Sequence, residues 1–190
     1  GGLDLQIIRL GIPPQDEYAK HLGPFELEAI WLMTSPKEGF GGFSSFLPPR
    51  GGEITTISDK GGQLHFSLPG GPGGEPQFRR TYQARKMWPF FNDIEAATRD
   101  PLSGKVWLAS EGRNAVARFG PDMRFEGLVM PASISGWGQN SAIEAMTRLP
   151  DGRFVVLREA FAGWFENTEH DALVFDSDPV DGAAARPFKV

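Results

Sequence analysis

Acidic residues recur in this sequence at a spacing that could gather them into one site. Glu95 and Glu144 lie forty-nine residues apart, in two copies of an Ile-Glu-Ala-x-Thr-Arg segment. Each copy is followed by a turn, a hydrophobic segment and a second acid, at Glu111 and Glu159. Clustered carboxylates repel one another, which raises their pKa values unless a cation or a guanidinium neutralises them. Hard oxygen ligands in this number suit Ca²⁺, so the pattern predicts a calcium or other divalent site.

A third, weaker copy precedes these two. Phe43-Ser44-Ser45-Phe46 takes the place of the first segment, and the acid that follows is Asp59. The acids come 15, 16 and 15 residues after Ser44, Glu95 and Glu144. A repeat of about 50 residues with strand-like units is typical of β-propeller blades. Because the innermost strand of each blade lines the central channel, we expect the equivalent acids to converge at one mouth of that channel.

The elements that must position these acids are short strands. The 24 glycines, 16 prolines and 12% aromatic residues suit strands joined by tight turns, and little helix is expected. The stretch around Pro13-Pro14 and Gly23-Pro24 is predicted to be turns. Beyond the three inner segments, strands are expected over 6–10, 25–34, 53–58, 63–68, 77–87, 105–110, 115–119, 125–129, 153–158 and 172–175, with the chain losing regular structure after 181.

The predicted fold is therefore an all-β propeller domain over residues 1–190. We expect strands of a closing blade in 1–36 and one four-stranded blade in each of 37–88, 89–138 and 139–190. Propellers close with about four to eight blades, so these three are expected to be part of a larger, six-bladed ring. Open ends expose unpaired backbone, which predicts self-association or a second chain that completes the propeller.

Composition restricts the partners. A net charge of −5 and a pI near 5.2 argue against a nucleic-acid binder, because such a surface repels polyanions. No apolar run is long enough for a membrane span, and no signal peptide is evident in the sequence as given. Cysteine is absent, which excludes disulfides and thiolate metal sites.

The acids have a structural interpretation as well. They could accept hydrogen bonds from neighbouring backbone amides, or pair with Arg99, Arg148 and Arg158 to hold blades together. Asn92 is a further candidate ligand. The full set of predicted metal ligands is Asp59, Asp93, Glu95, Glu111, Asn140, Glu144 and Glu159.

With the repeats laid out, the chain resembles the phytase-like family, known for the esterase-like activity of phytase. The resemblance covers about residues 25 to 178, and Lys60 stands where the family pattern has arginine. The later blades of the family pattern have no counterpart in this sequence. The segments that carry the resemblance are 41–46, 57–61, 93–96, 107–111, 140–145 and 149–153.

The resemblance implies a periplasmic or secreted, calcium-dependent hydrolase of phosphate esters or other esters. In that interpretation Glu95 and Glu144 are catalytic, and Lys60, Arg113 and Arg158 contact the substrate. Two alternatives remain: a non-catalytic propeller that binds a ligand or a protein, and a lactonase-like hydrolase with a divalent ion in the channel.

Overall fold

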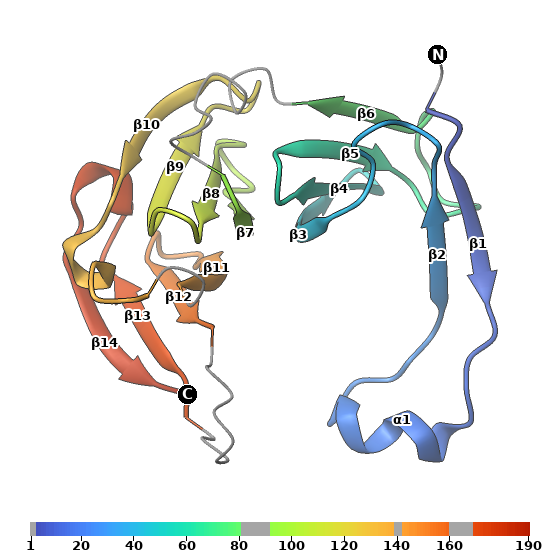
Figure 1. Ribbon diagram of the computed structural model, residues 1–190, viewed down its shortest axis with the longest axis horizontal. Coiled ribbons are helices and arrows are strands. Elements are labelled where there is room, and N and C mark those ends of the chain that lie inside the picture. Colours follow the sequence, from blue (N-terminus) through green and yellow to red (C-terminus); the bar gives the residue numbers. More distant parts are fainter. Residues whose placement is uncertain (1–2, 81–91, 139–141, 160–168) are drawn as a thin grey trace.

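The computed structural model describes residues 3–80, 92–138, 142–159 and 169–190. The fold is all-β, as predicted: three four-stranded antiparallel sheets and a separate pair of strands. Each sheet keeps its strands in chain order, so neighbours in sequence are neighbours in space (Figure 1). We name the three sheets blades 1, 2 and 3.

The elements have the following bounds. The N-terminal pair is β1 (Gln6–Leu10) and β2 (Ile30–Thr34), with helix α1 (Gln15–Leu22) between them. Blade 1 is β3 (Phe43–Arg50), β4 (Glu53–Ser58), β5 (Gly62–Phe66) and β6 (Gln77–Arg80). Blade 2 is β7 (Ile94–Arg99), β8 (Val106–Ser110), β9 (Ala115–Phe119) and β10 (Phe125–Val129). Blade 3 is β11 (Ile143–Arg148), β12 (Phe154–Arg158), β13 (Asp171–Phe175) and β14 (Ala185–Lys189), with the short 3₁₀ helices η1 (Ala132–Ile134) before it and η2 (Pro179–Asp181) within it.

Blade 2 is packed on both faces, which explains the continuous apolar sequence of β8. Val106 and Leu108 belong to the core that blade 2 shares with blade 1, whereas Trp107 and Ala109 belong to the core shared with blade 3. Successive side chains of a strand point to opposite faces, so a strand between two cores is apolar at every position. All five residues of β8 are buried.

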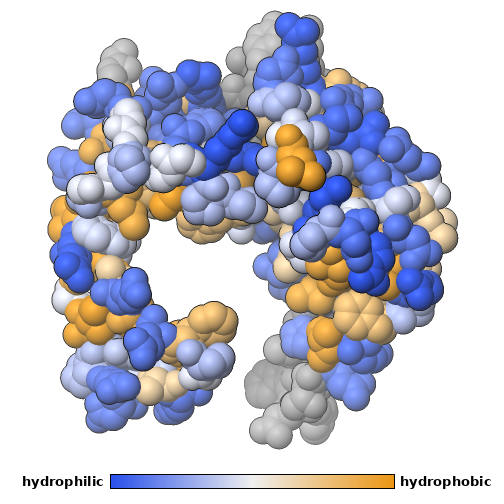
Figure 2. Space-filling model, turned by 180° about the vertical axis from the view of Figure 1, so that it is seen from behind, coloured by the Kyte–Doolittle hydropathy of each residue, from blue (hydrophilic) through white to orange (hydrophobic). Residues whose placement is uncertain are grey.

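The first strands of the blades lie on the inner side of an open arc. Figure 1 shows β3, β7 and β11 toward the centre and β6, β10 and β14 at the periphery. In space-filling view the arc encloses a wide hollow (Figure 2). We call the contact between blades 1 and 2 junction 1/2, and that between blades 2 and 3 junction 2/3. The predicted completion of the ring by further strands stays a prediction.

Three predictions about individual elements were wrong. Residues 15–22 form a helix rather than turns, because Pro14 precedes it, Asp16 and Glu17 lie in its first turn, and Lys20 and His21 lie in its last. The predicted strand over 25–34 begins only at Ile30. The segment after 181 regains regular structure as β14, the edge strand of blade 3. None of the described helices is long and apolar enough to span a membrane.

Candidate functional site

A register shift occurs at the same place in the first strand pair of every blade. In blade 2 the pairing of β7 with β8 skips from Ile94 to Ala96, which leaves Glu95 as the extra residue of a bulge. The same shift leaves Glu144 unpaired in blade 3 and Ser44 in blade 1. Bulges re-aim a side chain and are frequent beside active sites. The repeat therefore presents one specially oriented side chain per blade, and in two blades it is a glutamate.

The acids that follow the second strands lie directly beside these bulges. Each donates its backbone N–H to a carbonyl just before the first strand of its own blade: Asp59 to Gly42 at 2.9 Å, Glu111 to Asp93 at 2.8 Å and Glu159 to Ala142 at 2.9 Å. The three acids are thus structurally equivalent, as their spacing predicted. The N–H of Ile94 donates to Asp59 O at 3.0 Å, which links blade 1 to the start of β7.

Asp93 stands in a sparsely populated backbone conformation at this place. Its φ is 59°, in the left-handed region that few residues other than glycine adopt. The surrounding hydrogen bonds hold it there, since its carbonyl accepts from Glu111 and the hydroxyl of Ser110 donates to the carbonyl of Asn92. Aspartate is among the few residues that tolerate this conformation, and backbone of this kind clusters at functional sites. The strain thus adds to the case for a site here.

Glu95 is the most strongly perturbed carboxyl group of the site. Partial burial raises its pKa first, and the negative charges of Glu144, Asp93, Glu111 and Asp59 raise it further, in that order, to about 7. The acids contributed by blades 1, 2 and 3 are therefore close enough to act on one side chain. We call this group the acidic mouth: Asp59, Asp93, Glu95, Glu111, Glu144 and Glu159.

The other two perturbed carboxyls shift in the same direction. Partial burial and the charge of Glu159 raise the pKa of Glu144. Burial also raises the pKa of Glu111, against the hydrogen bond that its carboxylate accepts from the N–H of Ala142 at 3.3 Å. This last contact joins blade 2 to blade 3. At Glu111, therefore, the acid accepts a hydrogen bond from a neighbouring backbone amide, as the structural interpretation of the acids predicted.

The sequence matches the model of the phytase-like family, described as "Esterase-like activity of phytase", over residues 38–189. This chain belongs to the phytase-like family. The match includes all three blades and the whole acidic mouth, so the resemblance inferred from the repeats is confirmed. No curated protein matches the sequence.

Two solved structures are similar to the phytase-like chain in outline. One is a crystal structure of a nidogen/laminin complex, with 11% identity and a TM-score of 0.46 over 76% of this chain and 47% of that one. The other is YCF48 bound to a D1 peptide, with 14% identity and a TM-score of 0.45 over 84% of this chain and 44% of that one. This chain thus spans less than half the length of either.

The predicted calcium ligands of the phytase-like chain do not make up a metal site among the described residues. Among the described residues, no three or more histidine, aspartate or glutamate side chains lie close enough together to hold a metal ion. Asn140 lies outside the described residues. The acids gather, therefore, but their described side chains do not fit a calcium ion as they stand. Calcium use stays a prediction.

The predicted substrate-binding cations are spread around the mouth. Lys60 and Arg113 are exposed in the turns that follow Asp59 and Glu111. Arg158 is half-buried, donates to Asp171 Oδ2 at 3.1 Å and lies 5.9 Å from the centre of the Trp137 ring. The structural interpretation that paired Arg158 with an acid is met by Asp171, which lies outside the acidic mouth.

Sequence reasoning missed two charged groups at the junctions. Asp178 of blade 3 accepts hydrogen bonds from Trp107 Nε1 at 2.9 Å and from Arg118 at 2.6 Å, both in blade 2. At junction 1/2, Arg50 and Arg99 line a pocket that no sequence motif predicted. One sequence signal was available: Arg148 pairs with Asp100 across its junction, and Pro49 stands in blade 1 where blade 2 has Asp100.

Proposed function

We propose that the acidic mouth hydrolyses phosphate esters or other esters, with Glu95 as the residue that transfers the proton. The observation that carries this proposal is the position and pKa of Glu95: an extra residue in a bulge, with a pKa of about 7. A group with this pKa is populated in both protonation states near neutral pH. It can therefore protonate a leaving alkoxide or accept a proton from an attacking water.

Glu144 would set the pKa of Glu95 rather than share its role. The charge of Glu144 is the largest electrostatic contribution to the raised pKa of Glu95. In blade 1 the equivalent bulge residue is Ser44, whose hydroxyl donates to the carbonyl of Ile94. The carboxylate pair is thus confined to blades 2 and 3. This division supports one proton-transfer residue with one neighbour that tunes it.

The charge of the mouth bears on the substrate class. Six carboxylates repel a phosphate ester unless cations offset them, and Lys60 and Arg113 are the nearby candidates. Because the described acids do not fit a calcium ion as they stand, further neutralisation would have to come from a divalent cation that arrives with the substrate. A neutral carboxylic ester needs no such help. The proposal therefore orders the substrates: neutral esters first, and phosphate esters where a divalent cation is present. A periplasmic or secreted location belongs to the same proposal, on resemblance alone.

The test is a substrate panel read against pH. Hydrolysis of 4-nitrophenyl acetate, 4-nitrophenyl phosphate, phytate and a lactone is followed from pH 5 to 9, with Ca²⁺ or with chelator. We expect Glu95→Gln to lower kcat by about 100-fold or more, the usual worth of a positioned acid or base. Glu144→Gln should shift the pH profile toward lower pH, because it removes the largest charge that raises the pKa of Glu95. Exposed Glu17→Gln on α1 is the matched control.

A readout independent of turnover separates the roles. Titration of the Glu95 carboxyl by NMR should give a midpoint near 7 in the unsubstituted chain and a lower one in Glu144→Gln. Full activity of Glu95→Gln would refute the assignment of Glu95. Ligand binding without turnover of any ester would favour the second candidate, a binding propeller. The use of the Glu111 carboxylate to hold the Ala142 amide supports that candidate.

A further inference from the structure

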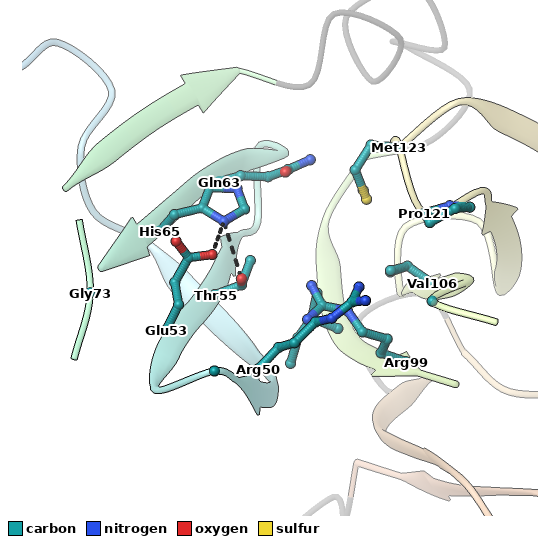
Figure 3. A pocket seen from close by; sticks show the side chains of 13 residues that line it. Arg50, Glu53, Thr55, Gln63, His65, Gly73, Arg99, Val106, Pro121 and Met123 are labelled. Carbon is teal, nitrogen blue, oxygen red and sulfur yellow. Dashed lines mark hydrogen bonds and ion pairs between the residues drawn. The ribbon is translucent and has the colours of Figure 1, made fainter. Parts of the chain in front are cut away.

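A second site lies at the other end of the inner strands from the acidic mouth. The pocket has a volume of about 390 Å³ and opens between blades 1 and 2, where β3 and β7 end (Figure 3). Polar side chains from both blades line it: Arg50, Glu53, Thr55, His65 and Arg99. Val106 and Met123 complete its wall on the side of blade 2. The volume is in the range of pockets that hold small molecules.

Two arginines from different blades meet in this pocket. Figure 3 shows the side chains of Arg50 and Arg99 extending into the same space. Partial burial and the charge of Arg50 both lower the pKa of Arg99, which a lone guanidinium in water would not experience. Neither arginine forms an ion pair with any residue in the described part of the chain. The pocket thus concentrates positive charge in a protein whose net charge is −5.

The acid in the pocket does not neutralise this pair. Glu53 Oε1 lies 3.3 Å from Nδ1 of His65, and that nitrogen also lies 3.2 Å from the hydroxyl of Thr55. In Figure 3 the Glu53 carboxylate turns toward His65 and away from the guanidiniums. Its charge acts on Arg99 only as the weakest of three influences. The histidine, threonine and glutamate therefore form a wall, with the guanidiniums opposite.

The repeat shows what is missing at this junction. At junction 2/3, Arg148 lies 3.2 Å from the Asp100 carboxylate of the preceding blade. Arg99 is the equivalent of Arg148, because each ends the first strand of its blade. The pair Leu47–Thr55 in blade 1 is equivalent to the pair Thr98–Trp107 in blade 2. Asp100 comes two residues after Thr98, so its equivalent in blade 1 is Pro49, two residues after Leu47. Junction 1/2 therefore has the cation of the pair without the carboxylate, and Arg50 adds a second cation.

We propose that this pocket binds a small molecule through a phosphate group, which takes the place of the carboxylate that junction 2/3 supplies for itself. Two neighbouring guanidiniums, one from each blade, offer up to four N–H donors, enough to engage three phosphate oxygens in charge-assisted pairs. A dianion matches two cations in charge, whereas a carboxylate would neutralise only one. The site lies outside the acidic mouth, so the proposal goes beyond the hydrolase and does not depend on it.

The experiment measures binding of inorganic phosphate and of phenyl phosphate by calorimetry at pH 7.5. We expect Arg50→Gln and Arg99→Gln each to weaken binding by about tenfold or more, the usual effect of removing one charged hydrogen-bond donor group. The matched control is Arg153→Gln, because Arg153 lies in the corresponding turn of blade 3 and is already paired with Asp151 at 2.8 Å. Thermal melts without phosphate verify that each variant is folded.

A grafted acid gives the sharper test. Pro49→Asp places a carboxylate where Asp100 stands at the other junction, and we expect it to abolish phosphate binding while leaving both arginines in place. Resonances of the His65 ring should shift on addition of phosphate, because that ring lines the pocket. This shift places the anion at junction 1/2 rather than at the mouth.

Three outcomes would overturn the proposal. Acetate that binds as tightly as phosphate would show a site without phosphate selectivity. Unchanged affinity in both Arg50→Gln and Arg99→Gln would remove the guanidiniums from the site. Loss of binding in Lys60→Gln, with both arginine variants unaffected, would place the phosphate at the acidic mouth. None of these results bears on ester hydrolysis, so the two proposals can fail separately.

Discussion

The two junctions of this protein are built on equivalent strands but balance their charges differently. Junction 2/3 neutralises its own cations: Arg148 meets Asp100 at 3.2 Å, and Arg118 meets Asp178 at 2.6 Å and Asp181 at 2.8 Å. At junction 1/2, Arg99 faces Arg50 with no carboxylate of the described chain in contact. In a repeat protein each unit contacts only its neighbours, so the residues at a junction determine how two units pack, and a junction that departs from the repeat pattern is a candidate for function.

The mouth ends of the junctions differ in the opposite sense. At junction 1/2, the bulge residue Ser44 donates a hydrogen bond to the carbonyl of Ile94 and is satisfied. At junction 2/3, Glu95 and Glu144 repel each other, and the pKa of Glu95 rises to about 7. Each junction thus has one settled end, where the polar groups have hydrogen-bond or ion-pair partners, and one end with unbalanced charge. The unbalanced ends are the two sites proposed for this chain.

The largest expected effect comes from breaking the settled contacts of junction 2/3. Asp178→Ala removes the acceptor of Trp107 Nε1, a partner of Arg118 and the cap of the Val180 N–H at 2.9 Å. We expect a loss of about 3 kcal/mol in the free energy of unfolding, because the buried indole N–H and the Val180 N–H lose their acceptor and Arg118 keeps only Asp181 and Glu126 of its described carboxylate partners. Urea denaturation followed by Trp fluorescence measures it.

A control on the same segment sharpens that test. Asp176 is exposed, and its one ion pair among the described side chains is with Arg186 at 2.7 Å. Exposed pairs contribute little, so Asp176→Ala should change the free energy of unfolding by less than about 0.5 kcal/mol. Equal losses in the two variants would mean that Asp178 has no special part in joining the blades.

A smaller effect is expected from the other ion pair of junction 2/3. Asp100 is buried and accepts from Ser103 Oγ at 2.6 Å, besides facing Arg148. The hydrogen bond from the Ser103 side chain, those from the Leu102 and Ser103 amides and the charge of Arg148 hold the pKa of Asp100 below its usual value. Asp100→Asn should therefore cost about 2 kcal/mol at pH 7.

The pH dependence of that cost has a definite sign. A carboxyl whose pKa is lowered by folding stabilises the folded state above the unfolded pKa of about 3.9, and this stabilisation is lost as pH falls through the folded pKa. The difference in the free energy of unfolding between Asp100→Asn and the unsubstituted chain should become smaller below about pH 4. A difference that stays constant down to the acid limit would show that the charge of Asp100 is not what joins the blades.

Much of the fold could be predicted because each repeat has its own local signals. The ranges predicted for β4, β9 and β10 match the structure residue for residue. Strand β14 was missed because its sequence, Ala-Arg-Pro-Phe-Lys, has a proline and four exposed residues, as an edge strand tolerates. Helix α1 was missed because prolines and a glycine frame it, and these were interpreted as turns.

The candidate site was predictable only in part. Equivalence of Asp59, Glu111 and Glu159 follows from spacing, and their gathering follows from the propeller. The bulges do not, because an extra residue is visible only once the register of two strands is known. The Arg50–Arg99 pocket depends on contacts between blades, which a local pattern does not contain.

The smallest expected effect concerns the end of junction 2/3 with unbalanced charge, where Glu95 lies. Folding raises the pKa of Glu95 from about 4.5 to about 7, so ionised Glu95 opposes the folded state. Stability should be greatest below the unfolded pKa and fall as pH rises from about 4.5 to about 7. Glu95→Gln removes this dependence. It should stabilise the chain by about 1 kcal/mol at pH 8, because solvent screening reduces the effect at a half-buried site, and by close to zero at pH 4.

The last prediction makes the mouth end of junction 2/3 resemble that of junction 1/2. Glu95→Ser gives junction 2/3 the residue that blade 1 has at its bulge, where the Ser44 hydroxyl donates to the carbonyl of Ile94. If the mouth ends differ only in this residue, Glu95→Ser should match the stability of Glu95→Gln at pH 8. Melting curves at pH 4 and pH 8 decide it. Lower stability of both variants at pH 8 would mean that the ionised carboxylate is held by a favourable contact, and the acidic mouth would not be the repulsive cluster on which the role of Glu95 rests.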